Sequence, residues 1–292
     1  MKRAKRVQFS ILFLTNVHCV NKSSYICIQK YFFKNNLLIK AQVAHWNKSM
    51  GKLFSWIGNF LKWTLITLVA GSILLVLLYR FVPVYSSPLM FIRVYEQISR
   101  GEKIRLHHQW VPLEEMSPDL PLAVMSCEDQ RFLIHNGFDW DAIQKVLEER
   151  EEGKRFRGGS TISQQTAKNV FLFPTAATGK LAWARKGVEA YFTVLIEFMW
   201  DKQRIMEVYL NTIEMGDGIY GAQAVAQEHF GRDAKNLTRN QCAMIAVTLP
   251  NPIKMNSANP TKYMYRRQSW CIRQMKHLGH FPTRDETEKE KD

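Results

Sequence analysis

The most densely polar stretch of the sequence is Gly158-Gly159-Ser160-Thr161-Ile162-Ser163-Gln164-Gln165-Thr166-Ala167-Lys168-Asn169. Its two glycines let the backbone approach a ligand closely, and Thr161 with Gln164 has the capping-box spacing that begins a helix. The free N–H groups and the dipole at a helix N-terminus favour an anion. The stretch therefore predicts a polar loop that leads into a helix and could hold an anionic group. On this stretch alone, an ordinary capped surface helix is the alternative.

Positive charge is concentrated at the N-terminal end of the chain. The 292 residues carry 40 Lys and Arg against 26 Asp and Glu, a formal net charge of +14 at pH 7. The first acidic residue is Glu96, and 13 basic residues precede it. The rest of the chain is therefore close to neutral, which argues against a nucleic-acid binder, whose basic surface should lie on the folded module. A basic N-terminal segment suits the anionic cytoplasmic face of a membrane instead.

The cysteines form no recognisable ligand or disulfide pattern. There are five, and none has the C-x-x-C spacing: Cys19, Cys27, Cys127, Cys242 and Cys271. An odd number of widely spaced cysteines predicts neither a disulfide scaffold nor a zinc site. We expect single buried thiols.

Residues 63–82 are predicted to form a transmembrane helix. The run from Trp63 to Tyr79 is uncharged and apolar, and its length corresponds to about 26 Å of helix at ~1.5 Å per residue, close to the ~30 Å hydrocarbon layer. Most of the early basic residues lie at or before Lys62. The positive-inside rule then places the N-terminus in the cytoplasm and the chain after about residue 80 outside. A buried core helix is the alternative.

Residues 1–49 are predicted to be an unstructured N-terminal extension, and residues 50–62 a cytoplasmic flank. The extension is basic and aromatic, without helical or strand periodicity, and it lacks the cleavage site of a secretory signal. Met50 is a second candidate start of the chain, because Met50-Gly51-Lys52 leads directly into the apolar run.

Residues 83–282 are predicted to be a mainly α-helical domain, followed by a charged tail over residues 283–292. Capping residues, apolar side chains at helical spacing and terminal glycines delimit successive helices, and no run alternates as a strand would. The clearest expected helices follow caps at Asp139, Thr161, Asp201 and Thr238, and the last covers residues 262–278. The fold class is therefore mainly α.

Two glutamates have surroundings that suit acid–base chemistry. Glu128 follows six mostly apolar residues, so we expect partial desolvation to raise its pKa towards that of a working base. Glu189 lies one turn after Arg185, beside an apolar stripe. For either glutamate alone, an ion pair or a place on a helix surface is the ordinary alternative.

Three consecutive motifs resemble those of the peptidoglycan glycosyltransferases, glycosyltransferase family 51. They are Glu128-Asp129-x-x-Phe132-x-x-His135-x-Gly137, the polar stretch quoted above, and Arg185-Lys186-x-x-Glu189-Ala190. Similarity continues through Glu207-x-Tyr209-Leu210-Asn211 to Asn251-Pro252, so it covers roughly residues 90–280. The resemblance implies a lysozyme-like helical domain that polymerises lipid II into β-1,4-linked glycan strands and releases undecaprenyl pyrophosphate.

The resemblance also implies roles for individual residues. Glu128 corresponds to the general base of an inverting reaction. Glu189 corresponds to a second essential carboxylate, which either orients the donor or assists through a divalent metal ion, magnesium or manganese. The residues implied in substrate binding are Arg157, Ser160, Thr161, Gln164, Gln165, Lys168 and Arg185. His135 and Asn211 match motif positions too, and we expect both to make buried structural hydrogen bonds.

The implied setting is the bacterial inner (cytoplasmic) membrane, crossed once, with the catalytic domain in the periplasm. Expected partners are lipid II, the growing glycan strand and the membrane; transpeptidases and division proteins are further candidates, and nucleic acid is not. A lone S-x-x-K run, Ser49 to Lys52, falls on the cytoplasmic side, so we expect no transpeptidase activity. The alternatives are a membrane-anchored, lysozyme-like lytic transglycosylase or hydrolase, and a non-catalytic cell-wall assembly scaffold.

Overall fold

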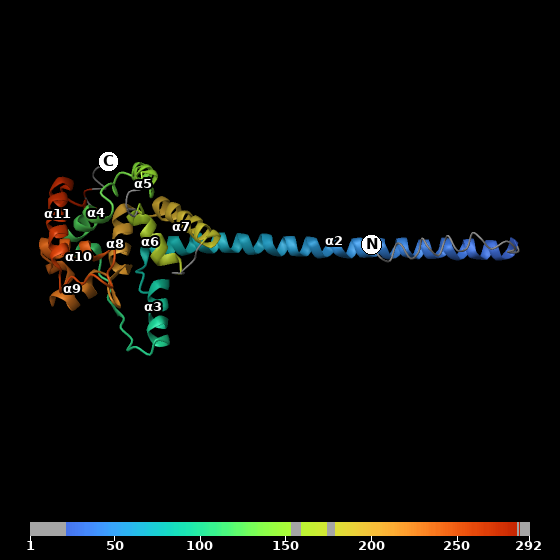
Figure 1. Cartoon of the computed structure of the whole chain (residues 1–292), viewed down its shortest axis with the longest axis horizontal. Helices are drawn as coiled ribbons and strands as arrows, with labels where there is room; N and C mark the ends of the chain where they lie inside the picture. Colours follow the sequence, from blue (N-terminus) through green and yellow to red (C-terminus); the bar gives the residue numbers. More distant parts are fainter. Residues whose placement is uncertain (1–21, 153–158, 174–178, 285, 287–292) are drawn as a thin grey trace. The chain divides into compact units, whose positions relative to one another are not determined.

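The computed structural model describes residues 22–152, 159–173, 179–284 and 286 (Figure 1). The chain separates into two compact units, residues 1–70 and 71–292, and each is described by itself. The first long element, α2 (Lys22–Phe81), begins in the first unit and ends in the second.

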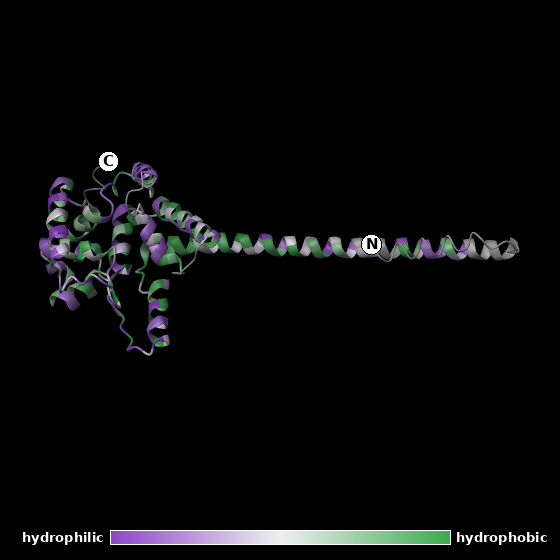
Figure 2. Cartoon of the chain, in the orientation of Figure 1, coloured by the Kyte–Doolittle hydropathy of each residue, from purple (hydrophilic) through white to green (hydrophobic). Residues whose placement is uncertain are grey.

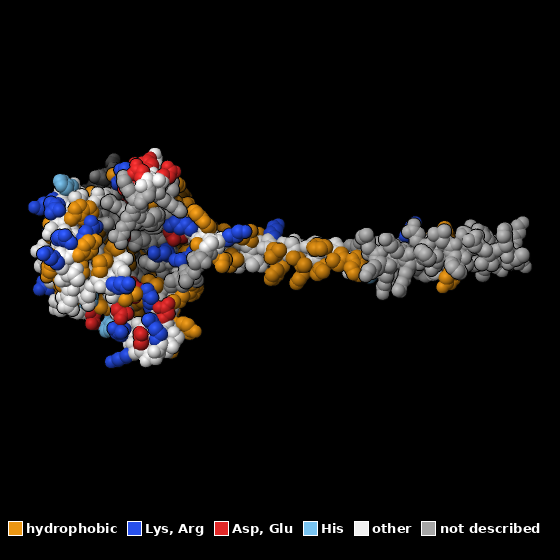
Figure 3. Space-filling view, viewed as in Figure 1, with side chains coloured by type: hydrophobic (Ala, Val, Ile, Leu, Met, Phe, Trp, Pro, Cys, Tyr) orange, Lys and Arg blue, Asp and Glu red, His pale blue; other side chains and the backbone are white. Residues whose placement is uncertain are grey.

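Helix α2 contains the apolar run seen in the sequence. Among the described residues it is the one helix long and apolar enough to cross a membrane: the segment Ala44–Phe81 includes a window of mean hydropathy 2.1, of which 6% is buried. Figure 2 colours this run as mostly hydrophobic, and Figure 3 shows apolar side chains exposed along it. The side chains of Trp63, Leu68 and Leu74 are each more than half exposed. An isolated apolar surface of this kind needs a lipid or protein environment.

The structure corrects the expectation of an unstructured N-terminal extension. Residues 22–49 belong to α2 and are helical throughout. This stretch contains neither proline nor glycine, so no residue in it blocks the helix, and a helix already formed over the apolar run extends without a second nucleation step. Residues 1–21 lie outside the described residues.

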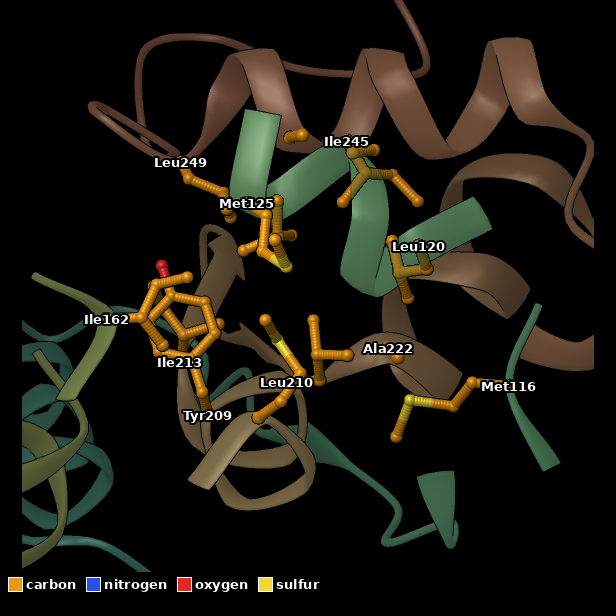
Figure 4. Close-up of a cluster of buried hydrophobic side chains, with 14 of the residues drawn as sticks. Met116, Leu120, Met125, Ile162, Tyr209, Leu210, Ile213, Ala222, Ile245 and Leu249 are labelled. Atoms are coloured by element: carbon orange, nitrogen blue, oxygen red, sulfur yellow. The ribbon is translucent and has the colours of Figure 1, made fainter. Parts of the chain in front are cut away.

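The second unit is mainly helical, as predicted. Its helices are α3 (Pro88–Ser99), α4 (Asp119–Glu128), α5 (Trp140–Glu151), α6 (Ile162–Phe171), α7 (Lys180–Met199), α8 (Lys202–Thr212), α9 (Ala222–Phe230), α10 (Arg239–Thr248) and α11 (Lys262–Leu278), with short 3-10 turns at Leu113–Glu115 and Ala234–Asn236. Helices α4, α10 and α11 pack on one another, and α6 packs on α7 and α8 (Figure 1). The two groups meet in one apolar core, where Met125 and Ile162 gather with Tyr209 and Leu210 of α8 (Figure 4).

Local caps start the helices where the sequence predicted. Thr161 and Thr238 each form a complete capping box, and the Asp201 side chain accepts a hydrogen bond from the backbone N–H of Arg204. The Asp139 carboxylate accepts one from the N–H of Ala142 at 3.0 Å and so begins α5. These caps satisfy N–H groups that a helix leaves unpaired at its start.

A small sheet was not predicted. Strand β1 (His107–His108) pairs in parallel with β3 (Ile219–Tyr220), which pairs antiparallel with β2 (Glu214–Gly216). Strands of two or three residues are too short to show alternation in a sequence. The tight turn before β3 requires Gly218, which has φ +74°, and a Cβ there would lie 2.4 Å from the Arg105 carbonyl oxygen.

The last turns of α2 are part of the second unit. Val76 is fully buried, and its carbonyl oxygen accepts a hydrogen bond from Trp200 Nε1 at 2.9 Å. The Arg204 guanidinium donates to the carbonyl oxygens of Tyr79 and Val82 at 2.8 and 2.6 Å. These carbonyls lie at the end of the helix, where no intrahelical partner is available. Arg204 therefore fixes the end of α2 to α8.

Candidate active site

Glu128 is the last residue of α4 and lies at the edge of the core. Gln165 of α6 donates from Nε2 to Glu128 Oε2 at 2.9 Å, and the Tyr209 hydroxyl donates to Gln165 Oε1 at 3.2 Å. Burial raises the pKa of Glu128, while the hydrogen bond from Gln165 and the charge of Lys168 oppose that rise. The direction of this pKa shift confirms the expected desolvation, and Gln165 holds the carboxylate in one orientation.

Asp129, the next residue, is turned inwards and has a structural role. Its Oδ2 accepts hydrogen bonds from the backbone N–H of Ile162 at 3.0 Å and from His135 Nε2 at 2.9 Å. The other ring nitrogen of His135 accepts from the N–H of Gly137 at 3.1 Å. His135 is thus buried and fully engaged in hydrogen bonds, as predicted. Asp129 places a negative charge at the N-terminus of α6, which the helix dipole favours.

Asn211 also confirms its predicted structural role. The side chain is fully buried; its Nδ2 donates to the carbonyl oxygens of Val111 and Glu207, and its Oδ1 accepts from the N–H of Val111 at 3.0 Å. These bonds hold the segment before α4 against α8 and satisfy the amide completely.

A cavity of about 470 Å³ opens beside Glu128. Its wall is formed by the end of α4 and the loop that follows, by α5, by residues 159–161 and by Trp270 of α11. Gly159 and Ser160 lie directly before α6, so the polar stretch of the sequence does face the cavity that Glu128 borders. The cavity wall therefore combines a desolvated carboxylate with the loop that precedes α6.

The cap of α6 uses two of the predicted binding residues internally. Thr161 Oγ1 donates to the Gly137 carbonyl oxygen at 2.7 Å and accepts from the N–H of Gln164, and Gln164 Oε1 accepts from the N–H of Thr161. Both side chains are buried. Their oxygens shape the loop, which leaves Ser160 as the exposed hydroxyl of the stretch. Arg157, also predicted to bind substrate, lies outside the described residues, as does Gly158.

Lys168 lies among the charged groups of the site. Burial lowers the pKa of its ammonium group; the negative charges of Glu189 and Glu128 oppose that effect, whereas Arg185 and Lys186 add to it. Electrostatic interactions weaken with distance, so the Lys168 ammonium lies near both Glu128 and Glu189.

Glu189 is buried on α7 and forms an ion pair with Lys186. The Lys186 ammonium also reaches Ser160 Oγ at 3.5 Å. Sequence reasoning did not assign a role to Lys186; its position three residues before Glu189 was the available signal, because residues at that spacing are neighbours on a helix. The arrangement brings α7 up to the loop that begins α6.

The charged partners of Glu189 in the described part of the chain are cations rather than further metal ligands. Its carboxylate is already paired with Lys186, and among the described residues no three His, Cys, Asp or Glu side chains come together as ligands. Magnesium in proteins is usually held by one or two carboxylates together with waters and substrate phosphates. Glu189 would therefore supply one carboxylate to an ion whose coordination substrate phosphates complete. The cations near Glu189 are Lys186, its ion-pair partner, and Lys168, where the negative charge of Glu189 opposes the lowering of the pKa by burial.

Comparisons with known proteins agree on one family. A family model described as Transglycosylase matches residues 95–276. The chain is 54% identical over 218 residues to the biosynthetic peptidoglycan transglycosylase of Bacteroides thetaiotaomicron, which covers 75% of this chain and 86% of that protein. It is 52% identical over 198 residues to the biosynthetic peptidoglycan transglycosylase of Bdellovibrio bacteriovorus, covering 68% of this chain and 77% of that protein.

A third relative extends the agreement. The biosynthetic peptidoglycan transglycosylase of Caulobacter vibrioides is 50% identical over 209 residues, which cover 72% of this chain and 86% of that protein. The match to the family model covers the whole of the cavity wall, from the end of α4 through the loop before α6 to Trp270, and it also covers Glu189. With its helical fold and its buried glutamates, the chain belongs to the transglycosylase family, glycosyltransferase family 51, and is a glycosyltransferase.

Proposed function

We propose that the protein polymerises lipid II into β-1,4-linked glycan strands and releases undecaprenyl pyrophosphate. The relatives described above are named as biosynthetic peptidoglycan transglycosylases. The observation that carries the proposal is the position of Glu128, a carboxylate with a raised pKa in the wall of a cavity that Ser160 also lines, with the Lys186 ammonium in reach of Ser160. A base and an anion-binding surface on the same cavity are what transfer from a sugar pyrophosphate requires.

Glu128 acts as the general base in this proposal. The 4-hydroxyl of the acceptor sugar attacks the anomeric carbon of the donor, its proton passes to the Glu128 carboxylate, and the bond to the pyrophosphate breaks on the opposite face. Attack from that face inverts the anomeric centre. The raised pKa makes Glu128 a stronger base than an exposed carboxylate, and a positioned base of this kind contributes about 10²- to 10⁴-fold in rate.

The leaving pyrophosphate needs compensation of its charge. Lys168 supplies one positive group, with Arg185, Lys186 and Glu189 near it, and the loop before α6 adds the exposed hydroxyl of Ser160. Glu189 keeps these cations in place and orients the donor. Such preorganised charges stabilise the transition state most strongly where water is excluded, because a low dielectric strengthens each interaction.

We further propose that α2 anchors the enzyme in the bacterial inner membrane with the catalytic domain in the periplasm. The apolar window of α2, the basic residues before it and the near-neutral charge after it support this orientation. The anchor keeps the active site close to a lipid-linked substrate. In this proposal the chain carries out polymerisation alone, and peptide cross-linking belongs to separate transpeptidases.

The proposal is tested with full-length protein in detergent and fluorescently labelled lipid II. Wild-type protein should yield polymeric glycan that a muramidase digests, and penicillin should not inhibit the reaction. Glu128→Gln should lower the rate by at least about 10²-fold, since it removes the base but keeps the hydrogen bond with Gln165. Glu102→Gln, on an exposed side chain, is the matched control and should retain full rate.

Three results would overturn the proposal. Normal polymer yield from Glu128→Gln would show that Glu128 is not the base. Cleavage of mature peptidoglycan without any polymerisation of lipid II would identify a lysozyme-type hydrolase, and no turnover of either substrate would identify a scaffold.

A further inference from the structure

Two cysteines from different helices meet directly beside Glu128. Cys127 lies in the last turn of α4, and Cys271 lies in the middle of α11, which packs on α4. The Cys271 thiol donates a hydrogen bond to the carbonyl oxygen of Ala123 at 3.6 Å. Ala123 and Cys127 are four residues apart and therefore share one face of α4. The face of α4 that carries Cys127 is thus the face on which Cys271 rests.

The Ala123 carbonyl that Cys271 contacts lies one helical turn before Cys127, so the two thiols are neighbours. A hydrogen bond with the Cys271 thiol is the largest cause that raises the pKa of Cys127; burial and the charge of Glu128 raise it further, and Arg267 opposes them. The sequence predicted single buried thiols, and this contact corrects that prediction for Cys127 and Cys271. A third thiol, Cys242, is fully buried on α10.

The two thiols differ in their access to solvent. Cys127 is partly exposed and contributes to the wall of the 470 Å³ cavity, whereas Cys271 is fully buried behind it. A small reagent that enters the cavity can therefore reach Cys127 first. Cys271 is then placed to complete a reaction that Cys127 begins, as a resolving thiol does.

We propose that Cys127 and Cys271 form a redox-sensitive pair, and that a disulfide between them switches the glycosyltransferase site off. The oxidant is a small disulfide. Cys127 loses its proton, a step that its raised pKa makes slow at neutral pH, and attacks one sulfur of that disulfide, whose other half leaves as a thiol. Cys271 then loses its proton, attacks the Cys127 sulfur and expels the second thiol. Two electrons and two protons pass to the oxidant, and the reverse exchange with a reducing thiol restores the pair.

The switch acts through the position of Glu128. A disulfide bond brings the two sulfur atoms to about 2.05 Å, much closer than a hydrogen-bonded contact, so its formation pulls the last turn of α4 towards α11. Glu128 is the next residue along this turn. A displacement of ~1 Å in a reacting group can cost about 10²-fold in rate. We therefore expect oxidation to lower kcat at least tenfold.

The inference rests on the proposed function for its activity readout, and on the periplasmic position of the domain for its setting. Disulfides form and persist outside the cytoplasmic membrane, whereas cytosolic thiols are kept reduced. The formation of the disulfide itself depends on neither proposal, because it requires only that the two thiols are neighbours.

The experiment uses full-length protein in which Cys19→Ser and Cys27→Ser remove the two N-terminal thiols. The reduced protein is treated with diamide, which joins neighbouring thiols. Intact mass should show the loss of two hydrogen atoms, and peptide mapping should recover a linked Cys127–Cys271 pair. Polymerisation of labelled lipid II should fall at least about tenfold and return after treatment with dithiothreitol.

Two further variants complete the design. Cys271→Ser keeps a hydroxyl that can donate to the Ala123 carbonyl oxygen, so it should retain basal activity and resist diamide. Cys242→Ser, the matched change at the other fully buried thiol, should stay sensitive.

The absence of the Cys127–Cys271 peptide after oxidation would overturn the inference. So would a mapped disulfide with undiminished polymerisation. Diamide that lowers the activity of Cys271→Ser as much as that of the parent protein would also overturn it. If the reduced protein fails to polymerise lipid II at all, the proposed function fails, and peptide mapping still decides whether the pair exists.

Discussion

The Asp129 carboxylate accepts a hydrogen bond from the backbone N–H of Ile162 at 3.0 Å, across 33 residues of sequence. It thereby joins the end of α4, which carries Glu128, to the start of α6, which carries Gln165 and Lys168. Its second bond, from His135 Nε2, fixes the loop between α4 and α5. One buried carboxylate thus holds together two of the three motifs that carry the proposed chemistry.

Asp129→Ala should lower the free energy of unfolding by about 3 kcal/mol, because it leaves the Ile162 N–H and His135 buried without their acceptor. The melting temperature should fall by roughly 6–12 °C for a domain of this size. Asp141→Ala, whose carboxylate is mostly exposed, is the control and should shift the transition by less than about 2 °C. Equal shifts for the two variants would contradict a special role for Asp129.

Gln165→Ala should move the acidic limb of the pH–rate profile to higher pH. The hydrogen bond from Gln165 favours the ionised form of Glu128 and so lowers its pKa. Without it the pKa rises further, and a base works only above its pKa. The profile of kcat/KM against pH measures this. Tyr209→Phe, which removes only the hydroxyl behind Gln165, should give a smaller shift in the same direction; a shift to lower pH in either variant would contradict the assignment.

Glu128→Gln should be more stable than the wild-type protein at neutral pH. The folded-state pKa of Glu128 is raised, so the native protein binds that proton more tightly than the unfolded chain does. Stability is therefore lost as pH rises through the raised pKa, and a neutral amide escapes this loss. Thermal unfolding measured from pH 4 to 8 should show that the melting temperature of Glu128→Gln exceeds that of the wild type by an amount that grows with rising pH. A constant gap would count against the raised pKa.

Lys168→Gln should lower kcat by about 10²- to 10³-fold, the usual cost of removing one charge-stabilising group from an active site. Its ammonium lies within the field of both Glu128 and Glu189. Lys168→Arg keeps the charge and should recover part of the loss, whereas Lys180→Gln, at an exposed position on α7, should have no effect. Steady-state polymerisation of lipid II measures all three, and full activity of Lys168→Gln would remove Lys168 from the mechanism.

Arg204→Met should loosen the junction between α2 and the catalytic domain. It removes the bonds to the Tyr79 and Val82 carbonyl oxygens and leaves the buried Glu207 carboxylate with Arg284 as its remaining ion-pair partner. Amide hydrogen exchange over residues 76–84 should become at least tenfold faster, since a loss of 1.4 kcal/mol in local stability corresponds to a factor of ten. Arg232→Met, at an exposed arginine, should leave this exchange unchanged.

Local physical chemistry explains why much of the fold could be predicted. The capping boxes at Thr161 and Thr238 depend on residues three positions apart, so the sequence displays them directly. Gly231 adopts the left-handed backbone conformation that ends α9, and a glycine after a helical run also shows this in the sequence. The short strands were missed because their pairing joins residues 107–108 to 219–220, and two residues carry no periodic signal. The helical state of residues 22–49 was missed because it depends on extension from the neighbouring apolar helix.

The sequence by itself determined the helical class, the order of the motifs, the apolar run of α2 and the identity of the two glutamates, because each depends on residue type and short-range spacing. Only the tertiary structure decided that Gln165 orients Glu128, that Asp129 binds Ile162, that Lys186 pairs with Glu189 in reach of Ser160, and that Cys271 lies against Cys127. Packing creates these contacts between distant residues, and burial then strengthens them by removing water.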